Sequence, residues 1–286
     1  MGLIEGKVAI VTGAGSGLGR SYANALAREG AAVVVNDFAG AAAKDTVSEI
    51  VDNGGKAVTN VADVGDVAGG ESLLTSALDS FGRVDILVNN AGILRDTSFV
   101  KMGEAQWDAI MHVHLKALYA STRPVFAWMK DNGNGGVIVN TTSTAGIRGN
   151  FGQSNYSTAK CGVIGFTNSL AIEGKKYGIR VWNIGPAAAT ALTAHMPEEY
   201  QRQFHIDRVA PTLLYMVSDL SGDQTGKTLM AGGGWVGECR FEVSEGYFPS
   251  DNLTAQEIAK AAADGKIFFP ERAGKWVTAY GPQSGE

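Results

Sequence analysis

The chain has 286 residues, of which 45% are hydrophobic and 19% charged, and its formal net charge is −5 at pH 7. This length fits one large α/β domain or two small ones, with enough apolar residues for a substantial core. The negative charge and the lack of a clustered Lys/Arg stripe give no support to nucleic-acid binding. Two cysteines, Cys161 and Cys239, make neither a metal cluster nor a disulfide framework, so no metal site is expected.

No apolar run approaches the length of about 18 residues that a membrane-spanning helix needs, so we expect no membrane partner. Residues 1–7 lack the apolar region of a signal peptide. The last residues are not a peroxisomal tripeptide of the Ser-Lys-Leu kind. We therefore expect a cytoplasmic protein.

A short apolar run over residues 7–12 is typical of a buried parallel strand and leads directly into a glycine-rich loop. The loop has the spacing Gly13-x-x-x-Gly17-x-Gly19 and precedes a helical stretch. Leu18 stands where the standard Gly-x-Gly-x-x-Gly fingerprint has its third glycine. A strand, a glycine turn and a helix N-terminus still let the backbone approach a dinucleotide pyrophosphate. A plain strand-to-helix turn is the alternative.

Acidic residues follow the next two predicted strands. Asp37 comes directly after the strand over residues 32–36, about 20 residues beyond the glycine loop, where a carboxylate can accept hydrogen bonds from both adenosine ribose hydroxyls. The same carboxylate repels a 2′-phosphate, so Asp37 favours NAD over NADP, with a turn aspartate as the alternative. Asp63 follows the strand over residues 57–61 and is placed to meet an adenine amino group.

Strands and helices alternate through this part of the chain. Predicted helices over 42–53 and 67–81 separate the strands, and the strand over 86–88 ends in a loop of small residues that suits close packing against a cofactor. The alternation predicts an α/β fold, a single Rossmann-type doubly wound parallel sheet of about seven strands with helices on both faces. We assign residues 1–234 to this domain and 235–286 to a C-terminal extension that packs on the core or on a neighbouring subunit.

The stretch 140–160 carries the candidate catalytic residues. Ser143 follows the apolar strand 137–139, at the carboxyl edge where open α/β sheets bind ligands. Tyr156 and Lys160 are one helical turn apart and share a helix face. An adjacent cation favours the phenolate, so Lys160 is expected to lower the pKa of Tyr156 toward neutrality. The alternative is a packed helix aromatic beside a solvated lysine.

The stretch from Glu104 to Met129 has the periodicity of one helix. His112 and His114 do not share a face of that helix, so a metal pair is not expected. The helix that follows Lys160 has little polar face, which indicates burial against a second subunit and a homodimer or homotetramer.

Taken together, the motifs resemble the short-chain dehydrogenase/reductase family. They are Thr12-Gly13-x-x-x-Gly17-x-Gly19, Asn89-Asn-Ala-Gly92, Ser143, Tyr156-x-x-x-Lys160 and Asp223-Gln-Thr-Gly226. A closer resemblance is to the (3R)-hydroxyacyl-CoA dehydrogenase part of peroxisomal multifunctional enzyme type 2. That resemblance rests on the segments 89–96, 149–153, 168–174, 196–198 and 234–237.

The resemblance implies roles for matching residues. Tyr156 would exchange the proton of a secondary alcohol, Ser143 would orient the substrate oxygen, and Lys160 would hold the nicotinamide ribose. The residues implied at the dinucleotide are Gly13, Gly15, Ser16, Gly17, Leu18, Gly19, Asp37, Asp63, Val64, Asn89, Ala91, Gly92, Tyr156, Lys160, Pro186, Ala189 and Thr190.

The sequence departs from the family pattern at two places. His114 stands where the family commonly has an asparagine, so it is either a member of a catalytic proton relay or a core histidine. The family's Pro-Gly is Pro186-Ala187 here, which leaves open whether Thr190 or Thr193 contacts the nicotinamide carboxamide.

These observations favour an NAD-dependent dehydrogenase that interconverts a secondary alcohol and a ketone. The small-molecule substrate implied by the resemblance is a 3-hydroxyacyl-CoA, including steroid side-chain thioesters. The alternatives are an NADPH-dependent 3-oxoacyl reductase, a hydroxysteroid dehydrogenase, and a non-catalytic protein that senses a dinucleotide.

Overall fold

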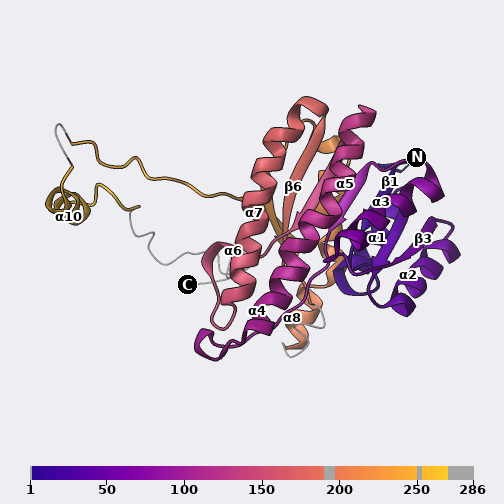
Figure 1. Ribbon diagram of the computed structural model, residues 1–286, viewed down its shortest axis with the longest axis horizontal. Helices are drawn as coiled ribbons and strands as arrows, with labels where there is room; N and C mark the ends of the chain where they lie inside the picture. The colour runs from indigo at the N-terminus through magenta and orange to yellow at the C-terminus, as the bar shows by residue number, and fades with distance from the viewer. Residues whose placement is uncertain (1, 190–196, 250–252, 270–286) are drawn as a thin grey trace.

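The computed structural model describes residues 2–189, 197–249 and 253–269. Its strands form one sheet in the order β3-β2-β1-β4-β5-β6-β7-β8, with helices on both faces (Figure 1). The strands are β1 (Val8–Val11), β2 (Ala32–Asp37), β3 (Lys56–Val61), β4 (Ile86–Asn89), β5 (Gly136–Thr141), β6 (Ile179–Pro186), β7 (Lys227–Gly232) and β8 (Trp235–Cys239). All neighbouring strands from β3 to β7 are parallel, which confirms the doubly wound fold.

The eighth strand is one more than the sequence predicted. β8 pairs antiparallel with β7 across a tight turn at Gly233 and Gly234, whose φ angles are +61° and +90°. Positive φ at both turn residues is the geometry of a two-residue hairpin, and glycine adopts it without strain. Because β8 is short and only partly buried, it lacks the apolar run that marks the other strands.

The helices agree with the predicted ranges to within a few residues, except over 104–129. There the expected single helix is divided by a π-helical turn, η2 (His112–Lys116). The α-helices are α1 (Gly17–Arg28), α2 (Gly40–Asp52), α3 (Val67–Phe81), α4 (Glu104–Met111), α5 (Ala117–Asn132), α6 (Ala145–Arg148), α7 (Ser154–Gly174), α8 (Glu198–Gln203), α9 (Ala210–Val217) and α10 (Ala255–Ala263). Short 3₁₀ turns are η1 (Phe99–Lys101), η3 (Lys175–Tyr177), η5 (Ile206–Arg208) and η6 (Asp219–Ser221).

The core has two parts, one on each face of the sheet. Ala9 and Val11 of β1 pack with α1, α2 and α9, whereas Val8 and Ile10 pack with α3 and α5. Successive side chains of a strand point to opposite faces, so a strand covered on both sides is apolar at every position. This is why the sequence of β1 is a continuous apolar run.

The sheet order places a crevice at the carboxyl ends of two strands. The chain goes from β1 outward to β2 and β3, and then returns to place β4 on the other side of β1. The loops after β1 and β4 therefore diverge, and ligands of doubly wound sheets bind at this point.

Beyond β8 the chain leaves the sheet. Residues 240–249 are extended, and α10 lies at their far end, away from the sheet (Figure 1). Within the described ranges, no helix has both the length and the apolar character of a membrane span.

Candidate active site

Ser143, Tyr156 and Lys160 converge at the carboxyl edge of β5, as predicted. Tyr156 and Lys160 both lie near the start of α7, and Lys160 Nζ is 5.5 Å from the centre of the Tyr156 ring. The Ser143 hydroxyl lies close enough to the Tyr156 phenol to favour its phenolate and lower the pKa of Tyr156. Its Oγ also accepts the backbone N–H of Ala145 at 3.2 Å, which fixes the rotamer. The three groups can therefore meet a single substrate oxygen.

Asn155 anchors the start of α7 and was not singled out from the sequence. It is fully buried, and its Nδ2 donates to the carbonyl oxygens of Arg95 and Gln106, both at 3.2 Å. Its Oδ1 accepts the Tyr156 backbone N–H at 2.7 Å. An asparagine beside a tyrosine has no distinctive local pattern, so only its partners in the folded protein identify this role.

Lys160 is buried, with 3% of its surface exposed, and its Nζ donates to the Thr141 carbonyl at 2.6 Å. Burial disfavours the charged ammonium and lowers the pKa of Lys160 to about 7. The lysine can therefore gain or lose its charge near neutral pH.

The structure corrects the expected effect of Lys160 on Tyr156. The pKa of Tyr156 is raised, chiefly because burial disfavours the phenolate; the Ser143 hydrogen bond lowers it, and the negative charge of Asp96 raises it further. The prediction of a lowered pKa was wrong because it counted the neighbouring cation but not the burial of the phenol. Tyr156 is consequently held in its protonated form.

His114 lies directly beside Tyr156. Its ring is buried and meets the tyrosine ring edge-on, with the ring centres 5.2 Å apart. His114 Nε2 faces the Ile93 backbone, 2.9 Å from its carbonyl oxygen and 3.2 Å from its amide nitrogen. Burial, with a smaller effect of Lys160, lowers the pKa of His114 to about 3, and the imidazole is neutral.

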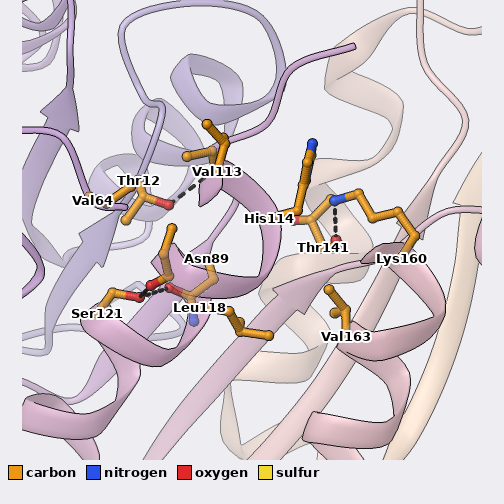
Figure 2. A pocket seen from close by; sticks show the side chains of 12 residues that line it. Thr12, Val64, Asn89, Val113, His114, Leu118, Ser121, Thr141, Lys160 and Val163 are labelled. Atoms are coloured by element: carbon orange, nitrogen blue, oxygen red, sulfur yellow. Dashed lines mark hydrogen bonds between the residues drawn. The ribbon is translucent and has the colours of Figure 1, made fainter. Parts of the chain in front are cut away.

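A small cavity connects His114 to Lys160 (Figure 2). Its volume is about 20 Å³, room for about one water molecule. His114 Nδ1 is buried and has no hydrogen-bond partner among the described residues. A water in the cavity could form a hydrogen bond with this nitrogen, so the arrangement suits a proton relay as well as a core histidine. The polar residues that line the cavity are Thr12, Asn89, His114, Ser121, Thr141 and Lys160.

Comparison with known proteins identifies the family of this chain. The family model described as short chain dehydrogenase matches residues 7–202. The chain belongs to the short-chain dehydrogenase family. It is therefore an oxidoreductase that acts on CH–OH groups, and the family binds a nicotinamide dinucleotide.

Two eukaryotic relatives match over most of this chain. The chain is 45% identical over 278 residues to peroxisomal hydratase-dehydrogenase-epimerase of Neurospora crassa, which covers 94% of this chain and 30% of the relative. It is 44% identical over 248 residues to peroxisomal multifunctional enzyme type 2 of Mus musculus, covering 83% of this chain and 33% of the relative. The chain thus spans about a third of the length of these two relatives. The predicted resemblance to the type 2 enzymes is confirmed.

Two bacterial proteins match over nearly their whole length. The crystal structure of a short chain dehydrogenase from Mycobacterium avium superimposes with a TM-score of 0.85 at 34% identity, covering 94% of this chain and 98% of that one. The (2S)-[(R)-hydroxy(phenyl)methyl]succinyl-CoA dehydrogenase subunit BbsD of Thauera aromatica is 39% identical over 243 residues, covering 81% of this chain and 97% of the relative. The short-chain dehydrogenase fold accounts for the chain from β1 to β8.

The glycine loop of this short-chain dehydrogenase fits a dinucleotide pyrophosphate. A Cβ at Gly19 would lie 2.1 Å from the Gly13 carbonyl oxygen, and a Cβ at Gly13 would lie 2.8 Å from Ala91 Cα. Both glycines let the loops after β1 and β4 approach each other. Gly17 has a φ of +53° and faces open space at the start of α1. Backbone N–H groups at this helix N-terminus are free to meet phosphate oxygens.

Asp37 and Asp63 lie at the carboxyl ends of β2 and β3. The two oxygens of Asp37 accept the backbone N–H groups of Gly15 and Ala39, both at 2.9 Å, so the carboxylate is fixed at the edge of the glycine loop. Asp63 Oδ1 accepts the Gly65 N–H at 2.8 Å. Both carboxylates retain lone pairs for a nucleoside.

The Asn89 side chain turns into the sheet. Its Nδ2 donates to Asn140 Oδ1 at 2.8 Å and to Thr122 Oγ1 at 2.9 Å, and its Oδ1 accepts from the Ser121 hydroxyl at 2.6 Å. Its side-chain groups therefore join β4 to β5 and to α5.

Thr12 holds the loop after β4 in place. Its Oγ1 accepts the backbone N–H groups of Asn90 at 3.0 Å and Ala91 at 3.1 Å. Gly92 lies against the His114 ring, where a Cβ would be 2.7 Å from Cε1. The predicted loop residues Ala91 and Gly92 thus lie beside Thr12 and His114.

The remaining predicted cofactor residues are spread around the same edge. Ser16 is exposed before α1, Leu18 packs partly against the core, and Val64 lines the small cavity. Pro186 ends β6, and the Ala189 N–H donates to the Phe204 carbonyl at 2.6 Å. The two candidate carboxamide contacts, Thr190 and Thr193, lie outside the described residues.

Proposed function

We propose that this chain is an NAD-dependent dehydrogenase that interconverts a 3-hydroxyacyl-CoA and the corresponding 3-oxoacyl-CoA. The observation that carries the proposal is the convergence of the Ser143 hydroxyl, the Tyr156 phenol and the Lys160 ammonium beside the crevice of the sheet. Such groups can hold and protonate or deprotonate one oxygen of a substrate.

The residues divide the chemistry as follows. The Ser143 hydroxyl orients the substrate oxygen, and Tyr156 exchanges a proton with it. The nicotinamide, when bound, supplies hydride chemistry at the adjacent carbon. Because burial keeps Tyr156 protonated, the phenol is ready to donate to a ketone oxygen. In alcohol oxidation Tyr156 must first lose its proton, and the buried Lys160 ammonium then stabilises the phenolate.

NAD rather than NADP is supported by Asp37. The fixed carboxylate lies where it can accept hydrogen bonds from the adenosine ribose hydroxyls, and its charge opposes a 2′-phosphate. A CoA thioester as substrate is supported by the resemblance to the dehydrogenase part of the multifunctional enzymes and by the name of the Thauera relative.

We also propose a cytoplasmic homodimer or homotetramer. The outer face of α7 leaves Cys161 and Ile172 exposed, the latter at 80%, although the sequence predicted this helix to be buried. A second subunit would cover such a face. Light scattering coupled to gel filtration measures the assembly, and a monomer at micromolar concentration would contradict it.

Formation of NADH, followed by its absorbance, tests the function. The protein is mixed with NAD or NADP and a panel of 3-hydroxyacyl-CoAs, hydroxysteroids and simple secondary alcohols, with Tyr156→Phe as the inactive control. Turnover of CoA thioesters with NAD is the expected result. A preference for NADP would indicate an NADPH-dependent 3-oxoacyl reductase, and turnover of free hydroxysteroids alone would indicate a hydroxysteroid dehydrogenase. Dinucleotide binding without any turnover would indicate a sensor.

A further inference from the structure

Asp63 is paired with His112, which does not contact Ser143, Tyr156 or Lys160. His112 Nε2 lies 3.3 Å from Asp63 Oδ2, while Asp63 Oδ1 accepts the Gly65 N–H at 2.8 Å. A carboxylate only accepts, so His112 Nε2 carries the proton in this contact. Each oxygen of Asp63 therefore has one donor from the protein, and the orientation of the carboxylate is fixed by both.

The loop around Asp63 is shaped to receive the imidazole. A Cβ at Gly65 would lie 2.2 Å from His112 Nε2, so the ring rests against a backbone that only glycine leaves open. A Cβ at Gly69 would lie 1.9 Å from the Asp63 carbonyl oxygen, so a second glycine brings the start of α3 against the same loop. The position of His112 is consequently determined by close packing as well as by the hydrogen bond.

The two histidines of η2 have different partners. His114 turns toward Ile93 and Tyr156, whereas His112 at the start of the turn meets Asp63 after β3. The His112 and Asp63 side chains remain 38% and 40% exposed, so the pair is open to a ligand on its outer side. Since a carboxylate has about four lone-pair sites, Asp63 can accept a further hydrogen bond.

We propose that His112 is a positioning residue for dinucleotide binding, because it holds the Asp63 carboxylate in the orientation that accepts the adenine amino group. The proposal rests on the proposed function, which supplies the dinucleotide. It assigns to His112 a role in recognising adenine and none in the reaction.

Paired binding titrations test the proposal. Affinities are measured by calorimetry for NAD and for nicotinamide hypoxanthine dinucleotide, whose base has an oxo group in place of the amino group. In wild type, NAD is expected to bind more tightly than the hypoxanthine dinucleotide, because only adenine has an amino group to donate to Asp63. His112→Ala is expected to weaken NAD binding by about three- to fivefold, the effect of losing one partly exposed charged hydrogen bond. The affinity for the hypoxanthine dinucleotide should stay unchanged, and His112→Gln, which keeps an N–H donor, should restore part of the preference.

Two further variants serve as controls for the effect of His112→Ala. Asp63→Ala removes the acceptor itself and should abolish the preference for adenine. Lys227→Ala removes the Lys227–Glu238 pair, which is of similar exposure at 3.0 Å on the β7–β8 edge, and should leave both affinities unchanged. Thermal unfolding of each variant shows that the fold is retained.

Each outcome separates the two proposals. If Asp63→Ala abolishes the preference but His112→Ala leaves it intact, His112 does not position Asp63. If His112→Ala weakens both dinucleotides equally, its role is structural and the inference fails. If wild-type protein binds neither dinucleotide, the proposed function itself fails.

Discussion

Replacement of Lys160 by methionine is expected to stabilise the folded protein at low pH while abolishing its activity. The pKa of Lys160 falls from 10.5 to about 7 on folding because the ammonium is buried. One pKa unit corresponds to ~1.4 kcal/mol, so the free-energy cost of keeping the ammonium charged in the folded protein is ~5 kcal/mol. Methionine has a similar length and no charge, but it leaves the Thr141 carbonyl without its donor, which costs about 1–3 kcal/mol. A net gain of ~2–4 kcal/mol remains.

The sign of this effect depends on pH. Below pH 7 the lysine is charged in both the folded and the unfolded state, so the folded wild type carries the whole penalty. Between pH 7 and 10.5 the unfolded state binds more protons than the folded state, so the stability of the wild type rises with pH. Above 10.5 neither state binds the proton, and the penalty is gone.

Urea unfolding of wild type and Lys160→Met at pH 6, 8 and 10, at one protein concentration, measures the difference. The variant should be more stable at pH 6, and its advantage should shrink and then reverse toward pH 10. Comparison of the two proteins cancels the titration of all other groups. If the difference in unfolding free energy between the two proteins does not change with pH, the conclusion that burial lowers the pKa of Lys160 is wrong.

Three more substitutions follow from the site. Asn155→Ala should lower the free energy of unfolding by ~2–4 kcal/mol, since it removes three hydrogen bonds from a fully buried amide; urea unfolding measures this. Asp37→Ala should shift the ratio of NADP to NAD affinity by about tenfold or more toward NADP, measured by calorimetry, since a charge opposing the 2′-phosphate is lost. Gly19→Ala should weaken dinucleotide binding by more than about tenfold, because its Cβ would collide with the Gly13 carbonyl and displace the loop.

Matched variants control these changes. Thr158→Ala removes an exposed hydroxyl of the same helix and should alter stability by less than about 0.5 kcal/mol. Gly165→Ala, where a Cβ meets nothing within 4 Å, should leave dinucleotide binding unchanged. A stable Asn155→Ala protein, an unaltered cofactor preference in Asp37→Ala, or tight binding by Gly19→Ala would each contradict the role assigned to that residue.

The sequence by itself determined the features that depend on local periodicity and backbone geometry. The apolar run of β1 predicted a strand buried on both faces, because only central parallel strands are covered on both sides. The glycine spacing before α1 predicted the tight loop, since glycine alone tolerates such close backbone contact. The spacing of Tyr156 and Lys160 predicted a shared face of α7, because helical geometry sets it.

The sequence pattern was too weak to predict two features of the fold, the strand β8 and the π-helical turn η2. The pair Gly233-Gly234 is a hairpin signal, yet the strand β8 beyond it has no apolar run that would separate it from a loop. The helical pattern over 104–129 continues through η2 without a break, so the π-helical turn leaves no local mark in the sequence.

Only the tertiary structure decided the electrostatics and the directions of the polar side chains. The pKa of Tyr156 rises because segments distant in the chain bury the phenol, and the residues next to Tyr156 in the sequence do not predict this burial. The Asn89 side chain is held by Asn140 of β5 and Thr122 of α5, which come within hydrogen-bond distance of it only after the sheet is paired and α5 packs on it. Local pattern fixes which residues can share a helix or a strand, whereas desolvation and side-chain hydrogen bonds depend on segments that meet only in the folded protein.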